Sequence, residues 1–102
     1  MNKQKIKQKI KEAVEKDPLK ENIQKVSLFG SYLRGDFEED SDVDVLIEFT
    51  PTAKIGFFKY FDIRENIEKH VQKKVDLLTP EALSKYFREE VLKEAEIIYE
   101  KR

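Results

Sequence analysis

The sequence predicts an α/β (α+β) fold, in which a small mixed β-sheet is flanked by helices. Two short apolar runs, residues 26–29 and 75–78, each stop at turn-forming residues, as buried strands do. Residues 43–49 alternate between apolar and polar side chains, which is the period-two pattern of a strand. Segments with apolar residues at helical spacing lie before, between and after these runs, and such a mixture predicts helices packed on a sheet.

The first half of the chain predicts a helix, a strand, a loop and a second strand. The opening helix should end near Pro18, because proline disfavours helix in the residue before it. The strand of residues 26–29 comes next, and the polar, acidic residues 32–41 predict a loop with a helical turn directly after Ser31. The second strand is residues 43–49. The residues that place the opening helix are Ile6, Ile10, Ala13 and Val14.

The second half predicts two further helices and two strands. Residues 55–71 are expected to form a helix and residues 75–78 a strand. Thr79 is a suitable N-cap for a helix over residues 81–93. Residues 96–99 either continue that helix or form a final strand, and we favour the strand. Four aromatic residues near the start of the 55–71 helix should lie mostly in the core, with the remainder free for a partner surface: Phe57, Phe58, Tyr60 and Phe61.

Length and composition favour one domain. The chain has 102 residues, of which 39% are hydrophobic, enough for a single modest core. We find no internal repeat, Gly/Ser linker or low-complexity segment that would divide it. We therefore predict a single domain over residues 1–102.

Charge and cysteine content narrow the class of protein. Lys and Arg number 20 and Asp and Glu 21, for a net charge of −1, so the overall basic charge of a dedicated nucleic-acid binder is missing. We expect no direct binding of nucleic acid. The absence of cysteine fits a reducing compartment. No apolar run approaches the roughly 20 residues that span a bilayer, and no signal peptide is visible, so we expect a cytoplasmic protein that does not enter membranes.

Three aspartates are placed where they could act together. Asp42 and Asp44 are two residues apart on one predicted strand, so their side chains leave the same face, while their apolar neighbours leave the other. Asp76 has the same relation to its neighbours on the 75–78 strand. If these two strands are adjacent, three carboxylates meet on one side of the sheet.

Such a cluster favours a divalent metal. Clustered carboxylates repel one another, and Mg²⁺ binds a few carboxylate oxygens together with water and substrate phosphates. One or two ions at Asp42, Asp44 and Asp76 could support an in-line phosphoryl displacement. Taken alone, an Asp-x-Asp is more often structural, because charges on edge strands prevent aggregation. Its occurrence together with the third aspartate and a phosphate-binding turn favours the functional interpretation.

That turn is Gly30-Ser31, at the end of the first strand. Glycine lets the backbone approach a phosphate closely, free N–H groups there bind anions, and the Ser31 hydroxyl adds a donor. Arg34 follows one helical turn later and could pair with a phosphate or with the acidic loop.

These residues resemble the signature of the polymerase-beta-like nucleotidyltransferase superfamily, which is Gly-Ser, ten residues, then Asp-x-Asp. Gly30-Ser31, residues 32–41 and Asp42-Val43-Asp44 have that spacing. The sequence around both motifs, and the Val75–Leu78 strand, are similar to the minimal nucleotidyltransferase (MNT) family. Leu33 departs from the alanine of many relatives and affects none of the polar positions.

The resemblance implies a polymerase-beta-like fold, ATP as substrate with Mg²⁺, and transfer of AMP to an acceptor. Asp42 and Asp44 would bind metal, Asp76 would complete the metal site and help deprotonate the acceptor, and Gly30 and Ser31 would hold the β- and γ-phosphates. MNT proteins commonly act as antitoxins of small helical toxins of the HEPN family, and some silence the toxin by adding AMP to a tyrosine.

The length of the chain favours a protein acceptor, because nothing is left for a substrate domain once the sheet and its helices are formed. We therefore expect an enzyme that adds AMP to a partner protein. Two alternatives remain open. The chain could be a non-catalytic antitoxin that acts by occlusion, although occlusion requires none of the motif residues. It could also be a transferase on a small molecule or an RNA end, with a pocket supplied by a partner.

Overall fold

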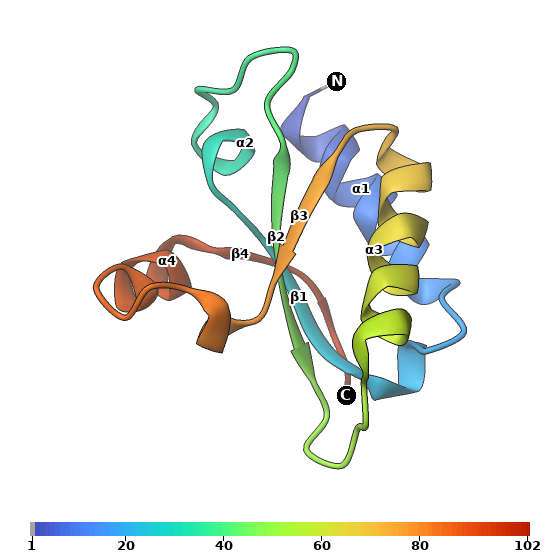
Figure 1. Ribbon diagram of the computed structural model, residues 1–102. Helices are drawn as coiled ribbons and strands as arrows, with labels where there is room; N and C mark the ends of the chain where they lie inside the picture. Colours follow the sequence, from blue (N-terminus) through green and yellow to red (C-terminus); the bar gives the residue numbers. More distant parts are fainter. Residues whose placement is uncertain (1) are drawn as a thin grey trace.

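The computed structural model describes residues 2–102, whose strands form one mixed four-stranded sheet in the order β3-β2-β1-β4 (Figure 1). Strand β2 runs antiparallel to β1 and parallel to β3, and β4 runs antiparallel to β1. The strands are β1 (Ile23–Phe29), β2 (Val43–Phe49), β3 (Val75–Leu78) and β4 (Glu96–Glu100). The predicted fold class and the final strand are confirmed.

Helices α1 (Lys3–Glu15) and α3 (Phe57–Val71) pack together on one face of the sheet, at the right in Figure 1. The Asn2 side chain caps α1 by accepting a hydrogen bond of 2.9 Å from the Lys5 N–H. The core lies between these helices and the sheet, so the parity predicted for β2 holds. Its most deeply buried side chains include Ile6, Ile10, Val26, Leu28, Val43, Val45, Ile63 and Ile67.

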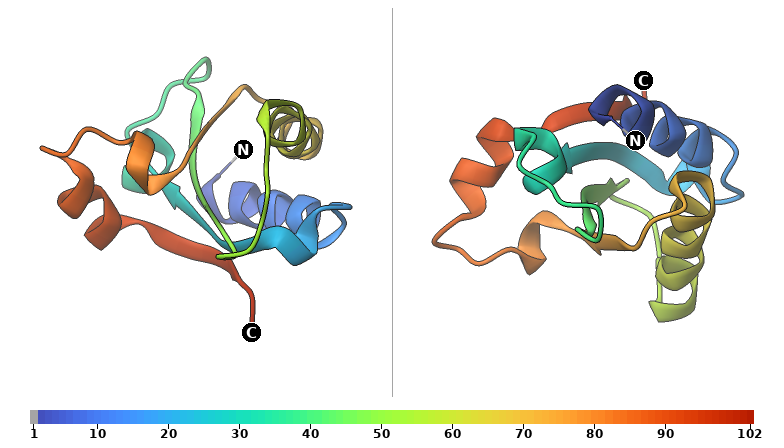
Figure 2. Two further views of the ribbon diagram at one scale, coloured as in Figure 1. Left: turned by 60° about the horizontal axis from the view of Figure 1, so that its bottom comes forward. Right: turned by 90° about the horizontal axis from the view of Figure 1, so that it is seen from above.

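The short helix α2 (Ser31–Arg34) and helix α4 (Arg88–Glu94) lie away from α1 and α3, at the left in Figure 1 and in the right view of Figure 2. Two single turns of 3-10 helix, η1 (Lys20–Asn22) and η2 (Pro80–Ala82), complete the fold. Within residues 2–102, none of the helices has the length and apolar character needed to cross a membrane.

The prediction of one helix over residues 81–93 is wrong. The 3-10 turn η2 ends at Leu83, whose backbone is extended, and α4 begins only at Arg88. A new turn starts at Ser84, whose carbonyl accepts the Arg88 N–H at 2.9 Å and whose hydroxyl accepts the Tyr86 N–H. The Arg88 side chain holds the break in place by donating to the carbonyls of Pro80, Glu81 and Leu83 at 2.8, 3.2 and 3.0 Å.

The expectation that most aromatic residues of α3 lie in the core is also wrong. Phe57 and Phe58 are 76% and 80% exposed, and Phe61 is 37% exposed. The buried stripe of α3 consists of Ile63, Ile67 and Val71, so the first turns of the helix carry no residue that is fully buried. The Phe57 ring lies beside the other two instead, with its centroid 5.6 Å from that of Phe58 and 6.4 Å from that of Phe61.

Strand β4 is interrupted in its pairing with β1. Val26 pairs with Tyr99 and Ser27 with Ile97, so Ile98 is an extra residue without a partner on β1. Such a bulge bends the strand locally. Because β4 has no neighbour on its outer side in the sheet, the bulge lies on an edge of the sheet.

Candidate functional site

The sheet brings two of the predicted carboxylates side by side. In the parallel pairing of β2 with β3, Asp44 is the register partner of Asp76 and Val43 that of Val75. Paired residues on neighbouring strands project to the same face about 5 Å apart. The buried valines therefore leave both aspartates on the face opposite the core, as the sequence predicted.

Gly30 lies beside Asp44 as well, at the end of β1, which pairs with β2 on the side opposite β3. Phe29, the last residue of β1, is the register partner of Asp44, and Gly30 follows it with a left-handed φ of +78°. A Cβ at Gly30 would lie 2.9 Å from the Asp44 carboxyl carbon and closer still to one of its oxygens. Glycine is therefore required here both by the backbone conformation and by the space that the Asp44 carboxylate occupies.

The electrostatics of Asp44 reflect this crowding. The pKa of Asp44 is raised from 3.8 to about 6, mainly by burial and in addition by the Asp76 and Asp42 carboxylates, while Arg34 acts in the opposite direction. Asp44 is partly buried, whereas Asp42 and Asp76 are exposed. The site thus holds one partly buried carboxylate with a raised pKa beside two carboxylates that are exposed to solvent.

Helix α2 supplies hydrogen-bond donors beside these carboxylates. Gly30 occupies its N-cap position without a side-chain cap, so the first N–H groups of the turn have no intrahelical acceptor. The predicted helical turn after Ser31 is confirmed. The Arg34 side chain, about half exposed, pairs with Asp36 at 3.4 Å. An anion at this turn would find backbone donors, the Ser31 hydroxyl and one guanidinium within the same short segment.

The acidic loop is fastened to the site by aromatic stacking. Tyr32 is fully buried and stacks on Phe37 at 4.1 Å between ring centroids. The Lys73 ammonium lies 5.9 Å from the centre of the Tyr32 ring and donates to the Glu39 carbonyl at 3.2 Å. Lys73 thereby links the loop to the segment just before β3. Sequence patterns gave no sign of the Lys73 contacts, because they join residues more than thirty positions apart.

The donor set suits a hard cation. The three aspartates offer oxygen ligands of the kind that Mg²⁺ prefers. Asp42 and Asp76 both raise the pKa of Asp44, and a bound cation would relieve the repulsion among the three carboxylates. Among residues 2–102, no three Asp, Glu, His or Cys side chains already converge closely enough to hold an ion as a group. The geometry is therefore that of an adjacent pair, Asp44 and Asp76, with Asp42 close enough to affect its charge.

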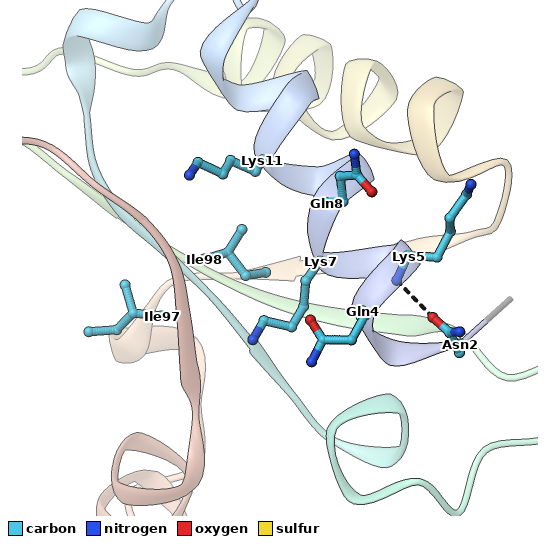
Figure 3. Close-up of a pocket in the computed structure, with 8 residues that line it drawn as sticks. All are labelled: Asn2, Gln4, Lys5, Lys7, Gln8, Lys11, Ile97 and Ile98. Atoms are coloured by element: carbon cyan, nitrogen blue, oxygen red, sulfur yellow. Dashed lines mark hydrogen bonds between the residues drawn. The ribbon is translucent and has the colours of Figure 1, made fainter.

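Two grooves among the described residues lie away from these carboxylates. One of about 590 Å³ separates α1 from β4 and is lined by residues such as Lys7, Lys11 and Ile98 (Figure 3). Of its three lysines, Lys7 pairs with Glu96 at 2.8 Å, and none of the predicted site residues lines this groove. Size alone therefore does not identify the functional site, and the carboxylates lie on an open surface.

Tyr60 is a residue near the site that the sequence did not single out for function. Its hydroxyl donates to the Leu77 carbonyl, next to Asp76. Burial raises the pKa of Tyr60, and the Asp76 carboxylate acts in the same direction. The sequence places Tyr60 only in a cluster of aromatic residues, and the packing of α3 beside β3 brings it next to Asp76.

Comparison with known proteins gives a family match over nearly the whole chain. Residues 8–102 match the family described as polymerase beta, nucleotidyltransferase. The protein adenylyltransferase MntA of Thermococcus cleftensis is 33% identical over 72 residues, which are 71% of this chain and 71% of that protein.

Solved structures agree with the fold. One of a candidate minimal nucleotidyltransferase superposes with a TM-score of 0.74 at 28% identity, over 93% of this chain and 94% of that one. The complex of a tri-AMPylated Shewanella oneidensis HEPN toxin with its MNT antitoxin gives a TM-score of 0.65 at 17% identity, over 97% of this chain and 73% of that one. At that identity the second likeness establishes the fold alone.

Proposed function

This chain belongs to the polymerase beta nucleotidyltransferase family, and from that premise we propose that it transfers AMP from ATP to a hydroxyl group of a partner protein, with tyrosine as the favoured acceptor. The observation that carries the proposal is the pair Asp44 and Asp76, in register on parallel strands and adjoining Gly30. We also propose that residues 1–102 act as one domain, since a single core includes residues from α1 to β3.

The roles of the residues follow from their positions. Asp42, Asp44 and Asp76 would hold one or two Mg²⁺ ions. Bound Mg²⁺ would neutralise phosphate charge and keep the attacking and leaving oxygens in line. Gly30 and Ser31 would hold the β- and γ-phosphates through backbone N–H groups and the Ser31 hydroxyl, with Arg34 pairing a phosphate oxygen.

The transfer itself needs one proton acceptor. The acceptor hydroxyl oxygen bonds to the α-phosphorus of ATP as its proton passes to a carboxylate oxygen of Asp76. The bond between the α-phosphorus and the bridging oxygen to the β-phosphorus breaks, and pyrophosphate leaves. Asp76 is exposed, so an incoming hydroxyl can reach it.

A protein acceptor fits the open site better than a small molecule or RNA. Asp42 and Asp76 are exposed, so a second chain can approach them directly and supply the rest of the acceptor site. Loop residues 36–42 carry five acidic side chains and no basic one, which disfavours a polyanionic acceptor such as RNA. We therefore propose no direct nucleic-acid binding.

The partner we propose is a small helical toxin of the HEPN type, with this chain as its antitoxin. The AMP-modified toxin bound by the structurally similar Shewanella oneidensis antitoxin supports this choice, as does the adenylyltransferase relative. Because ATP is the proposed donor, we place the reaction in the cytoplasm.

The decisive experiment is intact-mass spectrometry of the neighbouring gene product after incubation with this protein, ATP and Mg²⁺. We expect a gain of one or more AMP units, absent when the doubly substituted Asp42→Asn/Asp44→Asn protein is used. Tight binding without any mass gain would favour the occlusion antitoxin instead. Neither gain nor binding would mean that the acceptor is another molecule, to be sought among small molecules and RNA ends.

A further inference from the structure

Asp76 lies on the least supported strand of the sheet. Strand β3 has only four residues and is paired on one side, with β2. An edge strand leaves every second N–H and C=O group pointing away from its neighbour. The Lys74 carbonyl accepts the Val43 N–H from β2 at 2.9 Å. Backbone groups alternate in direction along a strand, so those of Asp76, two residues later, also point toward β2. The N–H and C=O groups of Val75 and Leu77 point away from it.

Two side chains of α3 occupy the outward groups on either side of Asp76. The Glu68 carboxylate accepts a hydrogen bond of 2.8 Å from the Val75 N–H. The Tyr60 hydroxyl donates to the Leu77 carbonyl. The residue before Asp76 and the residue after it are therefore both fastened to the same helix.

Arg64 lies between Tyr60 and Glu68 on the same stripe of α3 and pairs with Glu68. Tyr60, Arg64 and Glu68 are spaced four residues apart, so they form one stripe of the helix. Arg64 pairs with Glu68 at 3.8 Å and lies 4.8 Å from the centre of the Phe61 ring. Glu68 is thereby held by a cation on one side while it accepts the Val75 N–H on the other.

Both contacts also protect the edge of the sheet, but their placement on either side of Asp76 indicates a more specific role. Each contact is made one residue from Asp76, and the β3 backbone decides where the Asp76 carboxylate stands relative to Asp44. A reacting group misplaced by about 1 Å costs on the order of 100-fold in rate.

We propose that Tyr60 and Glu68 are positioning residues, which fix the Asp76 carboxylate in register with Asp44 by fastening the β3 backbone on both sides of it. This inference rests on the proposed function, because it assigns Asp76 to the reaction. It assigns neither Tyr60 nor Glu68 any contact with substrate.

The test compares four single substitutions. Tyr60→Phe removes the donated hydrogen bond and keeps the ring. Glu68→Ala removes the acceptor, and Glu68→Gln keeps an acceptor oxygen for the Val75 N–H. Asn66→Ala is the matched control, because Asn66 lies on the same helix but donates to the Ala13 carbonyl and to Asp17, away from β3.

For AMP transfer to the partner we expect Tyr60→Phe and Glu68→Ala to lower kcat about 10- to 100-fold while KM for ATP stays within about twofold. Glu68→Gln should recover most of the loss, and Asn66→Ala should retain the wild-type kcat. The second readout is independent of activity: the amide NMR resonance of Asp76 and hydrogen exchange at Val75 should change in Glu68→Ala and remain as in wild type in Asn66→Ala.

Wild-type kcat in both Tyr60→Phe and Glu68→Ala would overturn the proposal. So would a parallel loss of kcat and folding stability that Glu68→Gln fails to restore, because that pattern describes a general structural role. If wild-type protein transfers nothing to any acceptor, the proposed function fails separately. The Asp76 resonance and the Val75 exchange rate then decide by themselves whether the backbone is fastened as proposed.

Discussion

Substitution Asp44→Asn should stabilise the metal-free protein at neutral pH while removing its activity. The pKa of Asp44 rises from 3.8 to about 6 on folding. A carboxyl with a raised pKa favours the folded state only while it is protonated, so its ionisation costs stability as pH rises between those two values. Asparagine has nearly the same shape and carries no charge.

The expected size follows from the pKa. At about 1.4 kcal/mol per pKa unit, the rise corresponds to at most about 3 kcal/mol, and solvent screening of this partly exposed group reduces it to about 1–2 kcal/mol. Urea unfolding at pH 4 should give similar free energies of unfolding for wild type and Asp44→Asn. The variant should gain steadily from pH 4 to pH 6 and hold its advantage at pH 8.

Two comparisons make the test specific. Asp62→Asn, at an exposed position on α3, should change the free energy of unfolding little at any of these pH values. Addition of Mg²⁺ and ATP should raise the unfolding midpoint of wild type more than that of Asp44→Asn, because ligand that binds only the folded state stabilises it. If Asp44→Asn is equal to or less stable than wild type at pH 8, burial and the neighbouring carboxylates do not destabilise the ionised Asp44, and the reasoning fails.

Three further substitutions test the surroundings of the site. Gly30→Ala should lower the free energy of unfolding by about 1–3 kcal/mol, since the Asp44 carboxyl carbon is 2.9 Å from the new Cβ. The control is Gly35→Ala, because Gly35 is also left-handed but has no atom within 4 Å of the new Cβ. It should cost only about 1–2 kcal/mol, and equal losses in urea titrations would refute the contact at Gly30. Tyr32→Phe should be neutral or stabilising by about 1 kcal/mol, because the buried Tyr32 hydroxyl has no hydrogen-bond partner among the described residues; a drop in melting temperature would reveal one. Arg34→Ala should raise KM for ATP about 10-fold with little change in folding, and an unchanged KM in steady-state assays would remove it from nucleotide binding.

Much of this fold could be predicted because its signals are local. The alternation over residues 43–49 defined β2, and the apolar spacing of the first fourteen residues defined α1. The sequence could not show that Asp44 and Asp76 are register partners, because β2 and β3 are separated by a long connection and nothing local shows that they are adjacent. The break at Leu83 was missed because it depends on Arg88 bonding back to three carbonyls. The exposure of Phe57 and Phe58 was missed because residue type alone does not show which turns of a helix pack on the core; in α3 the buried residues begin only at Ile63.

The candidate site residues were predictable as a set of residue types and spacings, whereas the contacts that support them were not. Gly30, Ser31, Asp42 and Asp44 have a fixed spacing that can be recognised directly in the sequence. Tyr60 and Glu68 act on β3 through a helix that precedes it, and Lys73 fastens a loop from thirty residues away. Such contacts depend on how side chains meet after folding, so periodicity and motif spacing do not contain them.

Both margins of the sheet are closed to strand exchange by different means. On β3 the Tyr60 and Glu68 side chains occupy outward backbone groups, and on β4 the unpaired Ile98 distorts the ladder. A foreign strand would have to displace the first or match the irregularity of the second. Both features disfavour pairing with a foreign strand, so side-chain surfaces are the more accessible means of recognising another protein, and the same features should oppose assembly into β-fibres.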